Sequence, residues 1–316
     1  MPDLYPHRMS DLLTATLGRT GVNVTTLGFG AMELRNAADE DASARLLNAV
    51  LDAGITIIDT SPDYGPSEEL IGAGIAHRRD EYFLASKCGC QVEPPPPSDG
   101  FPDHLFDRRN IRAGVEQSLR RMRTDHLDLV QLHMSPSRST LEEHDSIAEL
   151  QALRDEGKVR FIGMSGTLPE LPDHIEMGVF DALQIPYSAL ERDHEDLVSD
   201  AAGAGAGTII RGGVARGVPE TLPATYARLP ESMRTRLERA TEERKARWQA
   251  AETELRDLLE GMTRMEFLLR FTLSHPAMHT TIVGTANPGH LAANVAAARK
   301  GPLPPDLYDE ACRRLG

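Results

Sequence analysis

The sequence predicts a single TIM-type (β/α)8 barrel, an α/β fold, with an N-terminal β-hairpin and long loops at the carboxyl ends of the strands. From residue 27 onward, eight short apolar segments alternate with longer stretches of helical periodicity, as repeated strand–helix units require. The chain has 316 residues, of which 40% are hydrophobic, and this is enough to fill one large core. A doubly wound open sheet would show the same periodicity and stays open as the structural alternative.

We expect one domain over residues 1–316, because barrels of this length commonly stay single. Ahead of the barrel, residues 14–26 alternate polar and apolar side chains around a glycine-containing turn, which predicts a hairpin that covers the barrel floor. The expected strands of the barrel are 27–30, 56–59, 82–86, 127–132, 161–165, 182–185, 207–210 and 280–283.

Helical spacing fills the segments between these strands. Ile111, Val115, Leu119 and Met122 are spaced so that they lie on one helical face. The other expected helices cover residues 43–52, 67–75, 144–156 and 265–273.

Two segments interrupt the alternation of strands and helices. Residues 91–103 contain a run of prolines, and a loop insertion at about 212–262 holds a glycine-rich start and a charged helix around Trp248, for which we expect a solvated face. Long loops at this end of a barrel usually shape the substrate entrance. An insertion that only covers a helix is the alternative.

The composition excludes several kinds of partner. Asp and Glu number 48 against 34 Lys and Arg, and the formal net charge of −14 repels nucleic acid. No segment reaches the roughly 18 apolar residues of a membrane span, and the first residues lack the apolar core of a secretion signal. Three cysteines fit a reduced compartment better than a disulfide framework. We therefore expect a cytoplasmic protein without a nucleic-acid or membrane partner, and we leave its oligomeric state open.

Four polar residues lie at or just after the ends of three neighbouring expected strands. Asp59 ends the second strand, Tyr64 follows in its loop, Lys87 comes at the end of the third, and His133 follows the fourth. Barrel enzymes collect their reactive groups at these ends. Taken singly, each residue has a structural explanation, as a helix cap, a packed ring, a solvated amine or a core histidine. Together they predict a proton relay.

In this relay, the phenol is the acid–base group that serves a carbonyl oxygen. A free tyrosine has a pKa of about 10, so it needs a nearby cation to stabilise its phenolate, and Lys87 supplies one. Asp59 would orient the ammonium group, and His133 would align the substrate oxygen. Such a relay needs an external redox partner or an isomerisable substrate. A barrel lyase or isomerase with a Schiff base on Lys87 stays open as an alternative.

We expect no metal, because Asp, Tyr, Lys and His together are not a usual ligand set. Cys88 and Cys90 have one residue between them, which matches neither the redox CxxC spacing nor, without a second pair of ligands, a zinc site. Both cysteines are interpreted as ordinary side chains, and their roles stay open.

Two loops with small residues follow the last two expected strands. The seventh strand runs into Arg211-Gly212-Gly213-Val214-Ala215-Arg216-Gly217, where backbone amides could approach a phosphate closely. The eighth runs into Gly284-Thr285-Ala286-Asn287-Pro288-Gly289-His290, in which Asn287 suits an N-cap and Pro288 the first helical position. Such a helix start favours an anion, although a flexible turn and an ordinary helix start are the alternatives. No GxGxxG motif follows a strand, which argues against a Rossmann domain.

Segments spread over almost the whole chain resemble those of the aldo-keto reductase superfamily. They are Asp59-Thr-Ser-Pro-Asp-Tyr-Gly65 with Ser67-Glu-Glu69, Leu17-Gly-Arg-Thr-Gly21, Leu27-Gly-Phe-Gly-Ala-Met32, Ala85-Ser-Lys87, Asp128-Leu-Val-Gln-Leu-His133, Gly157-Lys-Val-Arg-Phe-Ile-Gly163 and Gln184. The family's catalytic tetrad falls on Asp59, Tyr64, Lys87 and His133. The resemblance implies hydride transfer between a nicotinamide and the carbonyl carbon of a small aldehyde or ketone, or the corresponding alcohol, with Tyr64 as general acid or base.

The same likeness implies a set of cofactor contacts. Ser165 and Gln184 would hold the carboxamide, and Gly30 and Met32 would line the floor beneath the nicotinamide. The full set of residues expected to contact the cofactor is Gly30, Ala31, Met32, Asp59, Ser165, Gln184, Arg211, Gly212, Val214, Gly217, Gly284, Thr285, Ala286, His290 and Asn294.

The chain departs from the family pattern at three places. Arg211 stands where the family often has an aromatic residue that stacks on the nicotinamide, and a planar guanidinium could also stack there. Gly166 replaces the usual Asn, so one carboxamide hydrogen bond would be lost or moved. The family commonly binds a 2'-phosphate with Lys or Arg at positions that in this chain are occupied by Gly284 or Ala286 and by His290. The resemblance therefore favours NADP(H) and leaves NAD(H) open. A cofactor-sensing regulatory subunit of this fold is the alternative to an enzyme.

Overall fold

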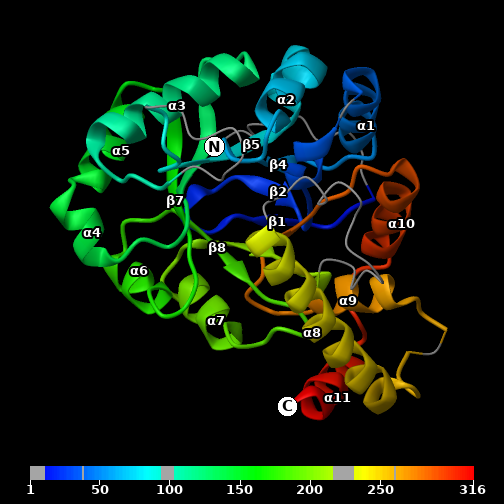
Figure 1. The fold of residues 1–316 in the computed structure, drawn as a ribbon. Coiled ribbons are helices and arrows are strands. Elements are labelled where there is room, and N and C mark those ends of the chain that lie inside the picture. Colours follow the sequence, from blue (N-terminus) through cyan, green and yellow to red (C-terminus); the bar gives the residue numbers. More distant parts are fainter. Residues whose placement is uncertain (1–10, 38, 94–102, 216–230, 260) are drawn as a thin grey trace.

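The computed structural model of the chain is a closed barrel of eight parallel strands surrounded by helices (Figure 1). It describes residues 11–37, 39–93, 103–215, 231–259 and 261–316. The predicted (β/α)8 barrel is confirmed, because the last strand pairs with both the first and the seventh and leaves no open edge. In chain order, the barrel strands are β3 (Leu27–Gly30), β4 (Ile57–Asp59), β5 (Phe83–Cys88), β6 (Leu127–Leu132), β7 (Val159–Ser165), β8 (Ala182–Pro186), β9 (Gly207–Arg211) and β10 (Thr280–Val283).

Helices follow the strands on the outside of the barrel, and within the described residues none combines the length and apolar character needed to cross a bilayer. Asp107 caps the third helix by accepting from the amide of Asn110. The α-helices are α1 (Glu40–Asp52), α2 (Ser67–Ile75), α3 (Arg108–Met122), α4 (Arg138–Glu143), α5 (Ser146–Asp155), α6 (Leu171–Met177), α7 (Glu195–Gly203), α8 (Glu231–Leu255), α9 (Arg264–Leu273), α10 (Pro288–Arg299) and α11 (Pro305–Leu315), and the 3-10 helices are η1 (Gly18–Thr20), η2 (Ala31–Asn36) and η3 (Ala76–Glu81).

Several boundaries differ from the sequence prediction by one to three residues, and two of these differences have a clear physical reason. The helix expected from residue 144 begins at Ser146, because Asp145 takes a left-handed backbone conformation with φ 50° and separates α4 from α5. Strand β5 continues to Cys88, because Lys87 and Cys88 pair in register with Gln131 and Leu132 of β6. Lys87 is therefore held within a strand.

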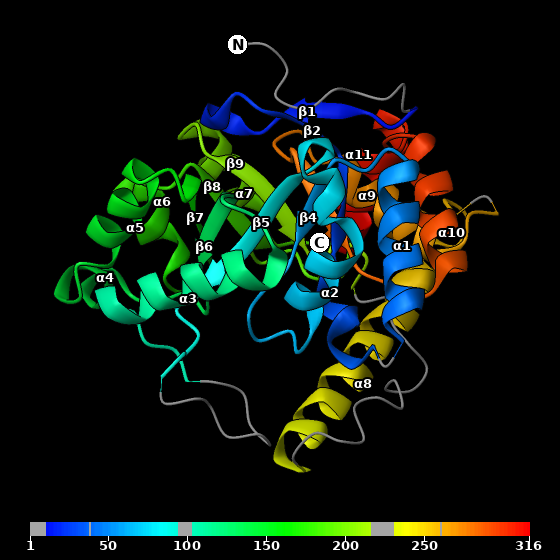
Figure 2. The same cartoon turned by 90° about the horizontal axis from the view of Figure 1, so that it is seen from above.

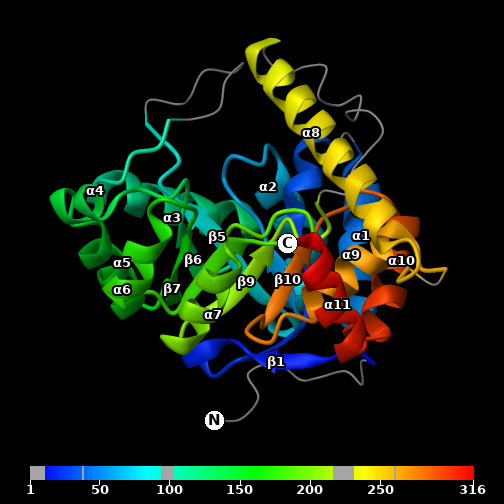
Figure 3. The same ribbon diagram turned by 90° about the horizontal axis from the view of Figure 1, so that it is seen from below.

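The predicted N-terminal hairpin is present and covers the amino end of the barrel. Strands β1 (Thr14–Thr16) and β2 (Asn23–Thr25) pair antiparallel around η1. Leu17 and Val24 are fully buried and pack in one cluster with Ile57 and Phe83, which belong to the barrel strands. Figures 2 and 3 show the hairpin lying across one end of the barrel, away from the end that α8 reaches.

Helix α8, within the predicted insertion, rises beyond the end of the barrel opposite the hairpin (Figure 3). Its charged sequence suggested a solvated helix, but Trp248, Ala251 and Leu255 are buried and form an apolar face. The guanidinium of Arg264 lies 5.8 Å from the centroid of the Trp248 ring. The expectation is therefore correct for one side of α8 only, since the other side packs on the protein.

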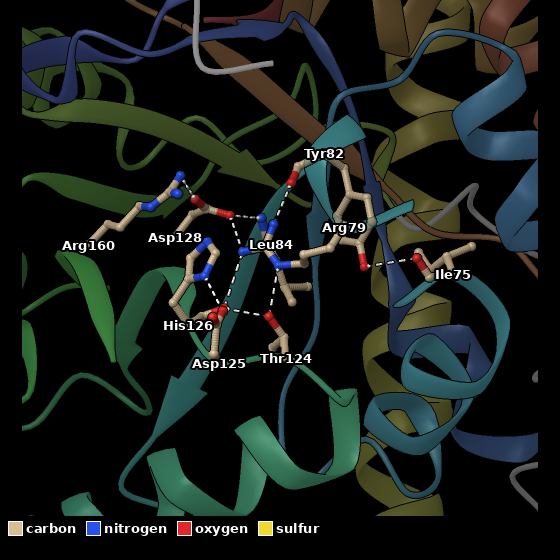
Figure 4. A network of polar contacts seen from close by, with 9 residues as sticks. All are labelled: Ile75, Arg79, Tyr82, Leu84, Thr124, Asp125, His126, Asp128 and Arg160. Atoms are coloured by element: carbon tan, nitrogen blue, oxygen red, sulfur yellow. Dashed lines mark hydrogen bonds and ion pairs between the residues drawn. The ribbon is translucent and has the colours of Figure 1, made fainter. Parts of the chain in front are cut away.

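A polar network ties the strands together near the barrel floor (Figure 4). The buried carboxylate of Asp128, in β6, accepts hydrogen bonds from the amide of Leu84 at 2.8 Å, from Arg79 at 2.6 Å and from Arg160 at 2.9 Å. Because these donors come from β5, η3 and β7, the carboxylate links neighbouring units of the barrel. Residues at this end of a barrel serve stability rather than chemistry.

Helices α2 and α3 approach each other closely at Gly72, which leads to a first prediction. A Cβ atom at Gly72 would lie 2.2 Å from the carbonyl oxygen of Arg121. We expect Gly72→Ala to lower the free energy of unfolding by about 1–3 kcal/mol, because the helices must separate. Gly203→Ala is the matched control, since its Cβ would meet nothing within 4 Å, and better helix propensity should leave the protein as stable or more so. Urea denaturation of both variants measures the difference, and equal stability would contradict the prediction.

Candidate active site

A buried lysine–carboxylate pair lies at the carboxyl end of the barrel strands. The Nζ atom of Lys87 is 2.7 Å from Oδ2 of Asp59 and 2.8 Å from the carbonyl oxygen of Thr60. Both side chains are almost fully buried, with 1% and 2% of their surface exposed. The same ammonium lies 5.1 Å from the centroid of the Tyr64 ring. The structure thus brings together three residues that the sequence singled out from two separate strands.

The second oxygen of Asp59 is also engaged. Oδ1 accepts hydrogen bonds from Nε2 of Gln131 at 2.9 Å and from Nε2 of Gln184 at 2.8 Å. The hydroxyl of Ser165 in turn donates to Oε1 of Gln184 at 3.3 Å. Gln184 and Ser165, expected to hold a carboxamide, therefore also orient Asp59 in this structure.

Sequence reasoning did not single out Gln131. A signal was nevertheless present, because Gln131 lies in β6 only two residues before His133, which directly follows that strand. The register of β5 and β6 places Gln131 beside Lys87. A polar residue near the carboxyl end of a strand, close to a predicted site residue, was the usable indication.

The electrostatics of the site favour a charged Lys87 and a protonated Tyr64. Burial raises the pKa of Tyr64, an effect opposed by the charge of Lys87 and reinforced by that of Asp59. Burial works to lower the pKa of Lys87, but Asp59 and then Tyr64 outweigh it and raise the value. A second cation, the guanidinium of Arg35, lies 5.2 Å from the Tyr64 ring centroid. The phenol therefore holds its proton at neutral pH beside cations that would stabilise its conjugate base.

His133 follows β6 and lies edge-on to Tyr64, with the ring centroids 6.5 Å apart. Burial lowers the pKa of His133 to about 3, which outweighs the opposite effect of Asp63. The imidazole is therefore neutral at physiological pH. Its Nδ1 atom faces Cys90 and His104, at 3.8 Å from the sulfur and 3.3 Å from Nε2 respectively.

The loops after β3 and β10 come close together beside this site. A Cβ atom at Gly284 would lie 2.6 Å from the carbonyl oxygen of Gly30, so only glycine fits there without a shift of the backbone. Buried Ala31 and half-buried Met32 continue from Gly30 into η2. Gly30, expected with Met32 beneath a nicotinamide, is therefore a neighbour of the first residue of the loop after β10.

The helix start predicted after β10 is present. Asn287 caps α10 by accepting from the amide of Gly289 at 2.8 Å, and Pro288 is the first helical residue. His290 lies exposed in the first turn, and Asn294 is buried one turn further on. Among the other predicted contacts in this loop, Thr285 is buried and Ala286 is exposed.

Arg211 is the last residue of β9, and its side chain is half-buried. Gly212 takes a left-handed conformation with φ 73°, and the buried Val214 follows it. Gly217, also expected to contact the cofactor, lies outside the described residues.

The glycine at position 166 is explained by packing. A Cβ atom there would lie 2.8 Å from Cδ1 of Leu171 and 3.2 Å from Nδ1 of His174. The space that the usual Asn side chain of the family would enter is therefore filled by α6. The packing of α6 against Gly166 therefore accounts for this departure from the family pattern.

Comparison with known proteins agrees with this fold. The family model described as the aldo/keto reductase family matches residues 26–311. A barrel with this match belongs to the class of oxidoreductase enzymes. The chain is a member of the aldo-keto reductase family.

Individual relatives cover nearly the whole chain. The aldo-keto reductase YhdN of Bacillus subtilis is 28% identical and aligns over 88% of this chain and 86% of its own length. L-galactose dehydrogenase of Arabidopsis thaliana is 28% identical over 92% of this chain and 89% of its own. Among solved structures, the holo form of aldo-keto reductase AKR11C1 from Bacillus halodurans is 26% identical, covers 96% of both chains and superposes with a TM-score of 0.78.

Proposed function

We propose that this enzyme transfers hydride between a nicotinamide cofactor and the carbonyl carbon of a small aldehyde or ketone, with Tyr64 as the general acid in reduction. The observation that carries the proposal is the position of the Lys87 ammonium, which is held by Asp59 and lies 5.1 Å from the centroid of the Tyr64 ring. A buried cation at this position makes the loss of the phenolic proton easier during the reaction.

Each residue has a defined part in the proposed reaction. A nicotinamide, when bound, supplies the hydride. As negative charge develops on the carbonyl oxygen, Tyr64 donates its proton, and the ammonium of Lys87 stabilises the phenolate that remains. His133 is neutral, so it retains one N–H group with which to hold the carbonyl oxygen. In alcohol oxidation the same groups act in reverse, with Tyr64 as the base.

Residues of this chain suit a dinucleotide near the loops after β9 and β10. Gly284 lies against Gly30, and neither residue has a side chain that would keep a cofactor away from the backbone. The first turn of α10 has backbone amides that can bind a phosphate. Arg211, at the end of β9, and Gly212, which follows it, would contact the cofactor. Ser165 and Gln184 would hold its carboxamide if their present hydrogen bonds are shared or exchanged.

A Schiff base on Lys87 is disfavoured by the same geometry. Imine formation needs a neutral amine, whereas Asp59 and Tyr64 raise the pKa of Lys87. Its ammonium also makes hydrogen bonds to Asp59 and to the Thr60 carbonyl. We therefore prefer redox chemistry over a lyase or isomerase reaction.

A panel of small aldehydes and ketones tests the proposal. The purified enzyme should consume NADPH, or NADH, over many turnovers with at least one class of carbonyl, and the product should be the corresponding alcohol. Cofactor binding detected by fluorescence without any turnover would support the cofactor-sensing alternative instead.

We propose NADP(H) as the preferred cofactor, with His290 as the residue nearest to a 2'-phosphate. Because a permanently charged guanidinium binds phosphate more strongly than an exposed imidazole, His290→Arg should tighten NADPH binding by about tenfold and leave NADH binding unchanged. Fluorescence titration measures both affinities. His77→Arg, at an exposed histidine on η3, adds the same charge elsewhere and should change neither. An equal gain for both cofactors would contradict the predicted contact.

A further inference from the structure

Four side chains with metal-binding atoms converge beside the predicted active site. They are Asp63 from the loop after β4, Cys90 and His104 from the segment after β5, and His133 from the end of β6. One ligand atom from each lies within 4.8 Å of all the others. Three separate loops therefore direct a carboxylate, a thiol and two imidazoles toward one point.

Four of the six separations between these atoms match those of a tetrahedral centre. Nε2 of His104 and Nδ1 of His133 are 3.3 Å apart, and Sγ of Cys90 lies 3.6 Å and 3.8 Å from them. Oδ2 of Asp63 is 3.7 Å from Nδ1 of His133. Bonds from Zn²⁺ of about 2.0–2.3 Å place tetrahedral ligand atoms roughly 3.3–3.8 Å apart. Cys90, His104 and His133 are thus spaced like ligands of one zinc ion, and Asp63 lies within 4.8 Å of all three.

Backbone pairing holds two of the four ligands in place. Cys90 and His104 form an antiparallel bridge, and the amide of Gln91 donates to the carbonyl of Asp103 at 2.8 Å. The two ends of this long loop are therefore joined whether or not an ion is bound. A ligand pair that is positioned in advance raises metal affinity, because less ordering is needed on binding.

The other two ligands also have supporting contacts. The hydroxyl of Ser61 donates to the second carboxylate oxygen of Asp63, which leaves Oδ2 toward the cluster. The backbone amide of His133 donates to the carbonyl of Cys88 at 3.1 Å. Such outer hydrogen bonds orient ligands in known metal sites.

We propose that Asp63, Cys90, His104 and His133 bind one Zn²⁺ ion in a closed site that joins the loops after β4, β5 and β6. The ligand set of one thiolate, two imidazoles and one carboxylate suits the tetrahedral preference of zinc. Four protein ligands leave no open position, so the ion fixes structure and does not activate water. This expectation replaces the absence of metal predicted from the sequence.

Zinc on Nδ1 of His133 would also fix the tautomer of that ring. With Nδ1 occupied by the ion, the remaining proton must be on Nε2. His133 would then present an obligatory N–H donor on its other side, which is the form that the proposed reaction needs. The site is thus compatible with the proposed function and does not depend on it.

Metal content provides the test. The full chain, purified with a thiol reductant, is loaded with Zn²⁺, freed of excess ion by gel filtration, and analysed by mass spectrometry. We expect about one zinc per chain, and at least tenfold weaker binding in Cys90→Ser and His104→Gln, because each loses a direct ligand. Cys312→Ser and His77→Gln remove the same residue types outside the cluster and should keep the zinc.

Cobalt gives a second readout that does not require activity. Co²⁺ in the wild-type protein should show the intense visible bands of a tetrahedral site together with a thiolate charge-transfer band, and Cys90→Ser should lose the latter. Circular dichroism of each variant verifies that it is folded, and His104→Gln, at a half-buried position, is the variant least prone to misfold. Wild-type protein without bound zinc, a cobalt spectrum without a thiolate band, or unchanged affinity in folded His104→Gln would each overturn the proposal.

Discussion

Tyr64→Phe is expected to lower kcat for carbonyl reduction by about 10²–10⁴-fold, the range that a positioned general acid contributes. The variant loses only the hydroxyl, so the ring still lies close to the guanidinium of Arg35 and the ammonium of Lys87. Affinity for the nicotinamide cofactor should therefore stay unchanged. Steady-state kinetics with a reactive aldehyde and fluorescence titration of the cofactor separate these two effects.

Tyr82→Phe is the matched control for this variant. The Tyr82 hydroxyl makes a long contact of 3.5 Å with the carbonyl of Ile75, in the network near the barrel floor. Its removal should leave kcat unchanged, because no reacting group lies at that end. If Tyr64→Phe retained wild-type kcat, or if it lost cofactor affinity in proportion to its activity, Tyr64 would not be the proton donor.

The sequence predicted the barrel and the meeting of Asp59, Tyr64 and Lys87 for the same reason. Parallel strands in a closed barrel end at one edge, so residues at successive strand ends must be neighbours, whatever their separation along the chain. The bounds of β3, β6 and β10 follow directly from their apolar runs. The position of Lys87 differs from the prediction in one detail. It lies within β5 rather than after it, because this part of β5 pairs with β6.

The metal-ligand cluster could not be predicted in this way. Cys90 and His104 meet through an antiparallel bridge between two segments that are distant in sequence, and no local rule predicts such a pairing. Asp63 stands next to Tyr64 in a motif that drew attention to the tyrosine instead. The reason for glycine at position 166 could not be predicted either. Side chains of α6 fill the space beside this residue, and their position depends on how that helix packs in the folded protein.

Lys87→Met is expected to lower the free energy of unfolding by about 3–5 kcal/mol, which is the usual cost of removing one partner from a buried ion pair. The variant leaves the carboxylate of Asp59, with 2% of its side chain exposed, without its cation. Gln131 and Gln184 still donate to Oδ1, but neutral amides cannot balance a buried charge. Activity should also fall, because the phenolate of Tyr64 loses its nearest cation. Urea denaturation and steady-state kinetics measure the two losses.

The double variant Asp59→Asn/Lys87→Met separates stability from chemistry. Replacing the orphaned carboxylate by a neutral amide removes the unpaired charge while its oxygen can still accept from Gln131 and Gln184. We therefore expect the double variant to regain most of the stability lost in Lys87→Met and to remain as inactive. An exposed pair such as Arg239–Glu243 on α8 provides the comparison, since Arg239→Met should leave the unfolding transition where it is. If the double variant were less stable than Lys87→Met, the buried charge would not be the cause, and if it recovered activity, Lys87 would not be the group that stabilises the phenolate.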